Sequence, residues 1–215
     1  MANNTGPRRA LVVIDVQNEY ISGKFLIEYP PVESSLANIK KALDAAEKHG
    51  IPVVMVQHVL PESAPIFARG SHGVKLHPSI ASRPYAHFVE KTLPSCFAGT
   101  DFGAWLTANK IDTLTIVGYM THNCDDSTMR EAFHAGYEVE FLHDAAGSLP
   151  YKNKAGSATA EEIHRAVSVV MQSAFAAVQT TDEWIASLIG GEKPERDNIF
   201  VSNQRVVQAR LTDTA

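Results

Sequence analysis

Short apolar runs alternate with amphipathic segments along most of this chain. Residues 11–15 (Leu-Val-Val-Ile-Asp) form a continuous apolar run that ends in a carboxylate, which is typical of a strand buried on both faces of a parallel sheet. In residues 36–46, apolar positions recur at three- and four-residue spacing. This periodicity predicts a helix that begins after Ser34 or Ser35 and stops at Gly50.

The same alternation continues downstream, with one interruption. Further strands are predicted at residues 52–57, 114–117, 137–143 and, as a short fifth strand, 178–181. Further helices are predicted from Thr100 or Asp101, over residues 125–135, over residues 159–172 behind a Thr159/Glu162 capping box, and over residues 182–188. Strands that alternate with helices predict an α/β fold: a doubly wound, mainly parallel sheet with helices on both faces, in three layers.

Two segments depart from this alternation. Residues 58–100 contain several prolines and glycines, and their only periodic piece is a brief alternation at residues 87–91. We expect a long functional loop or lid there, with residues 58–90 shaping the pocket. We expect residues 1–190 to form one domain, and residues 191–215 to be a tail or an oligomerisation arm that reaches a neighbouring subunit.

Composition narrows the class of protein. The chain has 215 residues, of which 45% are hydrophobic and 20% charged, values that suit one globular domain. The formal net charge of −5, without a Lys/Arg cluster, argues against nucleic-acid binding. No apolar stretch is long enough for a membrane helix, and the first nine residues lack the apolar segment of a signal peptide. We therefore expect a cytoplasmic protein whose two cysteines are free thiols.

The carboxyl ends of parallel strands meet at one edge of a sheet, where ligands bind. This rule brings Asp15, Gln57 with His58, the loop from Gly118 to Cys124, and Asp144 to the same edge. Cys124 follows a strand and stands at a predicted helix start, where the helix dipole is expected to lower the thiol pKa.

A thiol nucleophile also needs a proton acceptor and a positive group. Asp15 and Lys91 suit these two roles, and the three groups would titrate as a coupled unit. Structural alternatives remain: a buried packing cysteine, a strand-end carboxylate that caps a loop, and a solvated surface lysine. Cys96, the rival nucleophile, lies in the irregular region with no strand before it, which favours a packing role.

Three ordered motifs in this sequence match a known family. The first is residues 11–20 (Leu-Val-Val-Ile-Asp-Val-Gln-Asn-Glu-Tyr), and the second is residues 91–100 (Lys-Thr-Leu-Pro-Ser-Cys-Phe-Ala-Gly-Thr). The third is residues 117–124 (Val-Gly-Tyr-Met-Thr-His-Asn-Cys), with Ala-Gly-Tyr at residues 135–137 after it. With these motifs the chain resembles the isochorismatase-like cysteine hydrolases over about residues 9–188. That family includes nicotinamidases, N-carbamoylsarcosine amidohydrolases and streptothricin hydrolases.

The resemblance implies roles for individual residues. Asp15, Lys91 and Cys124 would be the catalytic triad, and the backbone N–H groups of Met120 and Cys124 would form the oxyanion hole. A cis peptide bond is implied at Tyr119–Met120. Candidate substrate-binding residues are Gln17, Tyr20, Phe97 and Tyr119, although the aromatic side chains could equally pack in the core and the amide could stabilise a loop. Family members commonly form homodimers or homotetramers.

The stretch after the second predicted strand lacks the Asp-x-His with which nicotinamidases of this fold hold a metal. His58, His72 and His77 could be assembled into a three-histidine site, but their spacing is unspecific, so we expect no metal and no cofactor. The expected activity is hydrolysis of a C–N bond in a small amide, with water, through a thioester. The alternatives are an ether hydrolase of secondary metabolism and a non-catalytic ligand-binding protein on the same fold.

Overall fold

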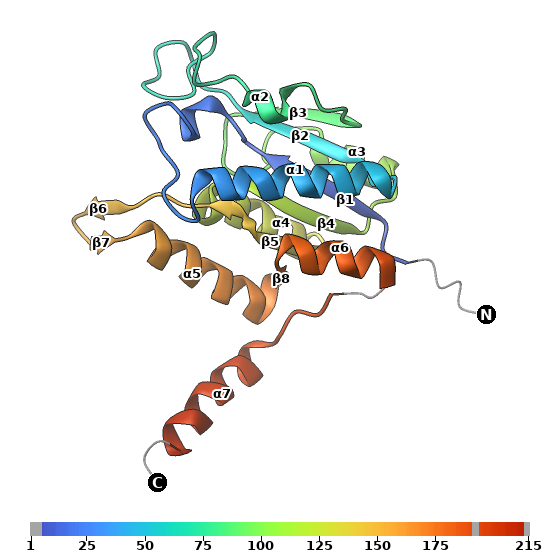
Figure 1. Ribbon diagram of the computed structural model, residues 1–215, viewed down its shortest axis with the longest axis vertical. Helices are drawn as coiled ribbons and strands as arrows, with labels where there is room; N and C mark the ends of the chain where they lie inside the picture. The colour runs from blue at the N-terminus through green and yellow to red at the C-terminus, as the bar shows by residue number, and fades with distance from the viewer. Residues whose placement is uncertain (1–5, 191–193, 213–215) are drawn as a thin grey trace.

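The computed structural model describes residues 6–190 and 194–212, and its centre is a six-stranded parallel sheet (Figure 1). The strands are β1 (Arg9–Ile14), β2 (Val53–His58), β3 (His87–Lys91), β4 (Thr113–Tyr119), β5 (Glu138–Gly147) and β8 (Ala177–Gln179). Their order across the sheet is β3-β2-β1-β4-β5-β8, and every neighbouring pair is parallel. The predicted doubly wound parallel sheet is confirmed.

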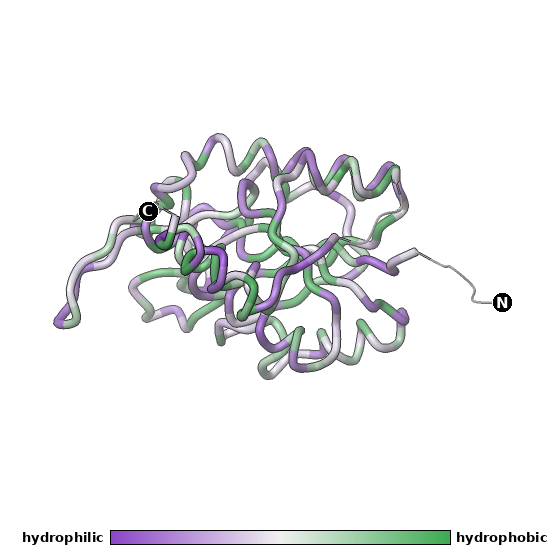
Figure 2. Tube along the Cα trace, turned by 90° about the horizontal axis from the view of Figure 1, so that it is seen from below, coloured by the Kyte–Doolittle hydropathy of each residue, from purple (hydrophilic) through white to green (hydrophobic). Residues whose placement is uncertain are grey.

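Helices cover both faces of this sheet, so that the domain has three layers (Figure 2). The α-helices are α1 (Val32–Lys48), α2 (Pro78–Ala81), α3 (Phe102–Ala108), α4 (Asp126–His134), α5 (Ala160–Val170), α6 (Thr181–Gly190) and α7 (Ile199–Thr212). Shorter helical turns are η1 (Asn18–Tyr20), η2 (Thr121–Asp125) and η3 (Met171–Phe175). Within the described ranges, no helix is both long and apolar enough to cross a bilayer.

Strand β1 shows why its apolar run is continuous. Leu11 and Val13 join the core cluster that also contains α1 and Trp184 of α6, whereas Val12 and Ile14 join the cluster that contains α3 and α4. Successive side chains of a strand point to opposite faces, so a strand between two helical layers needs apolar residues at every position. All six residues of β1 are buried.

The winding of the chain reverses between β1 and β4. From β1 the chain continues to β2 and β3 on one side, and then crosses to β4, β5 and β8 on the other. At the carboxyl end of this central pair, Ile14 lies opposite Gly118. A crevice at such a switch point is the usual binding position in an open α/β sheet.

Gly118 permits close approach of the two central strands. Its φ is +120°, and a Cβ atom there would lie 2.0 Å from the carbonyl oxygen of Ile14. Gly118→Ala is therefore expected to lower the free energy of unfolding by about 2–3 kcal/mol, because backbone strain and a backbone clash add together. Urea denaturation followed by circular dichroism measures this loss.

Gly136→Ala is the matched control for this substitution. Gly136 also has a positive φ, +90°, but nothing lies within 4 Å of its added Cβ. Only the backbone strain of the positive φ remains, so the expected loss in the free energy of unfolding is about 1 kcal/mol. Equal losses in the two variants would contradict the role assigned to the contact between Gly118 and Ile14.

Several predicted boundaries were wrong. Helix α1 begins at Val32 instead of after Ser34 or Ser35, and the Ser35 side chain lies inside the fold, 2.7 Å from the hydroxyl of Tyr119. The brief alternation at residues 87–91 is the full edge strand β3. A hairpin of β6 (Tyr151–Asn153) and β7 (Gly156–Ala158) was not predicted at all.

The segment after the sixth helix contains regular structure. Helix α7 projects from the layered body, and none of its described residues is buried (Figure 1). Residues 191–193 and 213–215 of the predicted arm lie outside the described residues. The assignment of residues 191–215 as a tail or oligomerisation arm stays a prediction.

Candidate active site

Asp15 is the residue that follows β1, and the turn of the chain there places its carboxylate at the end of the sheet. Its backbone N–H donates to Val56 O of β2 at 3.1 Å, and its φ is +51°. The left-handed conformation is strained for most residues, although aspartate tolerates it better than most. The side chain is fully buried.

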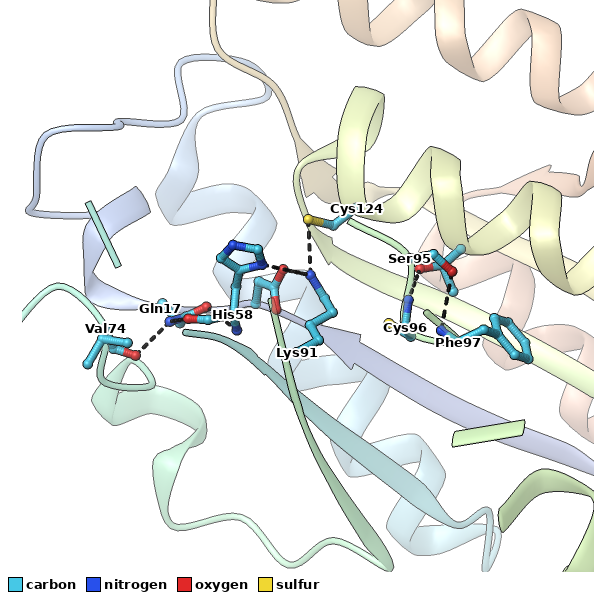
Figure 3. Close-up of polar contacts among 10 residues, drawn as sticks. Gln17, His58, Val74, Lys91, Ser95, Cys96, Phe97 and Cys124 are labelled. Carbon is cyan, nitrogen blue, oxygen red and sulfur yellow. Dashed lines mark hydrogen bonds and ion pairs between the residues drawn. The ribbon is translucent and has the colours of Figure 1, made fainter. Parts of the chain in front are cut away.

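Lys91 and Cys124 meet Asp15 from two other elements. Lys91 ends β3, and Cys124 lies in η2 directly after β4. The Lys91 Nζ atom donates to Asp15 Oδ2 at 2.7 Å. It also donates to Cys124 Sγ at 3.2 Å (Figure 3). The three side chains predicted to act together therefore converge, and the three residues are at most 3% exposed.

His58, the last residue of β2, adds a fourth group to this cluster. Its Nδ1 atom lies 3.3 Å from Lys91 Nζ (Figure 3). His58 stands opposite Lys91 in the register of β2 and β3, which brings both side chains to one place. Sequence reasoning put His58 at this edge of the sheet but gave it no role beyond that of a weak metal candidate.

The charges in the cluster follow from burial and from these contacts. Burial lowers the pKa of His58, and the Lys91 ammonium lowers it further, so the imidazole is neutral near pH 7. Burial alone would lower the pKa of Lys91, but Asp15 and Cys124 outweigh burial and raise it. Lys91 therefore stays positively charged, and the neutral imidazole of His58 can accept a hydrogen bond from its ammonium group.

The thiol pKa does not behave as the sequence predicted. Burial raises the pKa of Cys124 well above its usual range, Asp15 raises it further, and Lys91 opposes both effects. Cys124 also lies in the π-helical turn η2, before the first residue of α4. The expectation that a helix dipole lowers this pKa was wrong, and the resting thiol holds its proton until a base removes it.

Asp15 has an oxygen available for that purpose. Its Oδ1 atom is buried and has no hydrogen-bond partner within the described part of the chain. A buried acceptor left without a partner is costly, which is a common sign of a functional group. The carboxylate is thus paired with the ammonium through one oxygen and keeps the other free.

Cys96 has the surroundings of a packing residue. It is fully buried, its backbone N–H donates to Thr128 Oγ1 at 3.1 Å, and burial raises the pKa of its thiol to about 12. Both cysteines are free thiols, as predicted.

Gln17 links the end of β2 to the loop that contains Val74. Its amide nitrogen donates to His58 O at 2.8 Å and to Val74 O at 2.6 Å, and its Oε1 accepts from His58 N at 2.9 Å (Figure 3). Both amide protons are thus used by the backbone. This geometry matches the loop-stabilising alternative better than the predicted contact with substrate.

The predicted aromatic pocket residues separate into two groups. The Tyr20 ring lies 5.1 Å from that of Phe67 and 5.5 Å from that of Tyr119. Phe97 instead packs against Phe102, with ring centroids 4.8 Å apart. Tyr20 and Tyr119 thus share one aromatic cluster, and Phe97 belongs to another.

Two other residues singled out from the sequence have structural partners. Asp144 lies inside β5, and its Oδ1 accepts from the backbone and hydroxyl of Thr181 at the start of α6. His77 Nδ1 accepts from Ser79 N, which caps α2. The Tyr119–Met120 peptide bond is cis, as the resemblance implied.

Potential metal ligands gather in one place within residues 6–190 and 194–212. Asp15, His58 and Cys124 offer ligand atoms that all lie within 4.8 Å of one another. His72 and His77 are not part of this group. The three-histidine arrangement considered from the sequence is thus not the one that the fold assembles.

The sequence and the fold both have clear relatives. The family model of the isochorismatase domain matches residues 9–183. The isochorismatase family protein YddQ of Bacillus subtilis, itself uncharacterized, is 30% identical over 178 residues, which cover 82% of this chain and 98% of that protein. A crystal structure from Burkholderia xenovorans LB400 that carries the isochorismatase name has 60% identity and a TM-score of 0.95, covering 96% of this chain and 100% of the other.

Two similar proteins carry the names of specific enzymes. Streptothricin hydrolase of Streptomyces noursei is 33% identical over 139 residues, which cover 64% of this chain and 49% of that protein. Ureidoacrylate amidohydrolase RutB of Agrobacterium fabrum is 28% identical over 173 residues, which cover 65% of this chain and 76% of that protein.

Proposed function

The chain belongs to the isochorismatase family of hydrolases, and from this premise we propose that it cleaves the C–N bond of a small amide through a thioester on Cys124. The observation that carries this proposal is the contact of one buried ammonium, that of Lys91, with both the Asp15 carboxylate and the Cys124 sulfur. The cation is thus within hydrogen-bond distance of both the nucleophile and the base, and the sulfur and the carboxylate lie within 4.8 Å of one another. Two similar proteins are named as an amidohydrolase and as streptothricin hydrolase, which supports an amide substrate.

The proposed first step is attack on the amide carbon. Asp15 takes the thiol proton as the sulfur attacks, and Lys91 stabilises the negative charge on the sulfur and on the carboxylate. General-base assistance is needed because burial and Asp15 keep the thiol protonated at rest. The backbone N–H groups of Met120 and Cys124 would hold the oxyanion.

The second half of the reaction reverses the roles of Asp15. The protonated carboxyl gives its proton to the leaving nitrogen, which departs as ammonia or an amine and leaves a thioester. Asp15 then accepts a proton from the attacking water and returns it to the departing Cys124 sulfur, which gives a carboxylic acid, the free thiol and the restored carboxylate. Cleavage of a vinyl ether needs protonation and not acyl transfer, so it would not use the Cys124 thiol as a nucleophile.

A panel of small primary amides, secondary amides and ureido compounds tests the proposal. Release of ammonia or amine identifies a substrate, and acid quenching during turnover is expected to trap one acyl group on Cys124, located by mass spectrometry of peptides. Added hydroxylamine should divert the thioester to a hydroxamate. Turnover of an amide with no acyl group on Cys124, or release of product from a vinyl ether instead, would refute the proposed mechanism.

The proposed reaction is independent of a metal ion. Lys91 provides a positive charge beside the thiol and the carboxylate, the place where a Lewis acid would act. Dialysis against dipicolinate is therefore expected to change kcat on the identified amide by less than about twofold, with metal content followed by mass spectrometry. Loss of activity that added Zn²⁺ restores would contradict this expectation.

A further inference from the structure

The Lys91 ammonium is surrounded by three acceptors. Its Nζ atom lies 2.7 Å from Asp15 Oδ2, 3.2 Å from Cys124 Sγ and 3.3 Å from His58 Nδ1. An ammonium has three protons, so each proton has one acceptor. The acceptors come from the ends of β1 and β2 and from η2, which are held together by the sheet.

The same three acceptors are the side chains that can ligate a metal ion. A carboxylate oxygen, an imidazole nitrogen and a thiolate sulfur are all ligands of tetrahedral zinc sites. Their atoms lie within 4.8 Å of one another, and the ammonium nitrogen contacts all three. A divalent ion could replace the ammonium if the ligands moved inward by about 1 Å each.

We propose that Asp15, His58 and Cys124 form a cation site, the "cation cage", which the Lys91 ammonium occupies, and that His58 is a positioning residue for that ammonium. His58 accepts a hydrogen bond from the third N–H group of the ammonium, so that the other two N–H groups point at the carboxylate and the sulfur. The catalytic meaning of this arrangement rests on the proposed function, whereas the cage itself does not. The ammonium supplies the positive charge around which a thiol, a carboxylate and a histidine can share one buried place.

Removal of the lysine side chain tests the cage directly. Lys91→Ala is expected to bind one Co²⁺ per chain, and the Cys124 thiol should release one proton to the buffer as its sulfur bonds the ion. Thiolate-to-cobalt charge-transfer absorption reports this bond. The wild-type protein should show no such absorption, because Lys91 fills the cage.

Two double variants assign the ligands. Lys91→Ala/Cys124→Ala should lack the charge-transfer absorption, and Lys91→Ala/His58→Leu should bind Co²⁺ at least about tenfold more weakly than Lys91→Ala. Folded Lys91→Ala protein without the absorption would overturn the cage. Equal Co²⁺ affinity with and without His58 would overturn the assignment of the histidine.

A second measurement uses variants that retain Lys91, and it tests the positioning role of His58 even if Lys91→Ala does not fold. It compares His58→Leu, which has no acceptor, with His58→Asn, whose Oδ1 can take the place of Nδ1, by the rate at which iodoacetamide alkylates Cys124. We expect His58→Leu to lower this rate about tenfold and His58→Asn to recover most of the loss. His49→Leu, at an exposed histidine after α1, should leave the rate unchanged.

Equal slowing in His58→Leu and His58→Asn, or no slowing in either, would refute the positioning role. Cobalt binding and alkylation both proceed without amide turnover. Failure to find an amide substrate therefore leaves the outcome of both measurements intact, and failure of the cage leaves the substrate panel intact.

Discussion

Cys124→Ala is expected to lower kcat for amide hydrolysis by at least about 10⁴-fold. Among the described side chains that contact Lys91 Nζ, those of Asp15, His58 and Cys124, only the Cys124 sulfur can form a thioester. Alanine is expected to keep the fold, since Cys124 is one member of a large buried core cluster and the substitution removes one sulfur atom. Single-turnover assays at high enzyme concentration measure the residual rate, and circular dichroism checks that the variant is folded.

Cys96→Ala is the matched control for the loss of a thiol. Cys96 is also buried, but its backbone pairs with the hydroxyls of Thr128 and Thr100, its side chain lies in the core, and burial raises its thiol pKa to about 12. We expect kcat within about threefold of the wild type, with a loss of about 1 kcal/mol in stability from the small cavity. Substantial turnover by Cys124→Ala, or comparable inactivation by Cys96→Ala, would remove Cys124 from its assigned role.

Glu140→Ala is expected to lower the free energy of unfolding by about 3–5 kcal/mol. Glu140 is buried at the centre of a polar network in β5, where its carboxylate accepts from Arg9 Nε at 2.9 Å, Thr115 Oγ1 at 2.6 Å and Trp184 Nε1 at 2.9 Å. Its removal leaves the buried Arg9 guanidinium without a counter-charge and two further donors without an acceptor. Equilibrium unfolding in urea measures the effect.

Asp182→Ala provides the comparison for this prediction. Asp182 pairs with Lys41 on the surface, where their side chains are 74% and 48% exposed. The expected loss is below about 1 kcal/mol, because solvent screens such a pair. The double variant Arg9→Met/Glu140→Leu should regain only the part of the loss that comes from the unpaired guanidinium, since the donors of Thr115 and Trp184 still lack their acceptor. A loss in Glu140→Ala no larger than that in Asp182→Ala would show that the network adds little.

The sheet and two members of the site could be predicted because one rule links sequence to position. A continuous apolar run indicates a central parallel strand, and the residue after such a strand lies at the binding edge. This rule placed Asp15 and Cys124 in advance. Lys91 was assigned from its charge, and only the family resemblance supported its position, because the alternation at residues 87–91 is too short to be recognised as an edge strand.

The role of His58 could not be read from the sequence for a related reason. Its contact with Lys91 depends on the pairing of β2 with β3, which puts His58 opposite Lys91. Residues 87–91 were not predicted as a strand, so no sequence pattern placed His58 next to Lys91. The pKa of Cys124 was mispredicted because a sequence shows the helix start but not how completely the thiol is buried next to a carboxylate.

The start of α1 and the grouping of aromatic residues show the same limit. Ser35 carries a strong capping signal, but its hydroxyl pairs with the Tyr119 hydroxyl across the core, and the helix begins one turn earlier. Phe97 follows Cys96 in a family-like motif, yet it packs on Phe102 of α3. Both outcomes are decided by contacts between residues far apart in the chain, which local patterns do not contain.

The order of the strands also has a consequence for biosynthesis. Because β4 pairs directly with β1, the central strand pair of the sheet cannot form until residues 113–119 have been synthesised. A nascent chain on the ribosome can bring Asp15 and Lys91 together while Cys124 is still inside the exit tunnel. Cys124 is thus the last member of the proposed triad to leave the ribosome, so a chain that is cut short before residue 124 lacks the thiol.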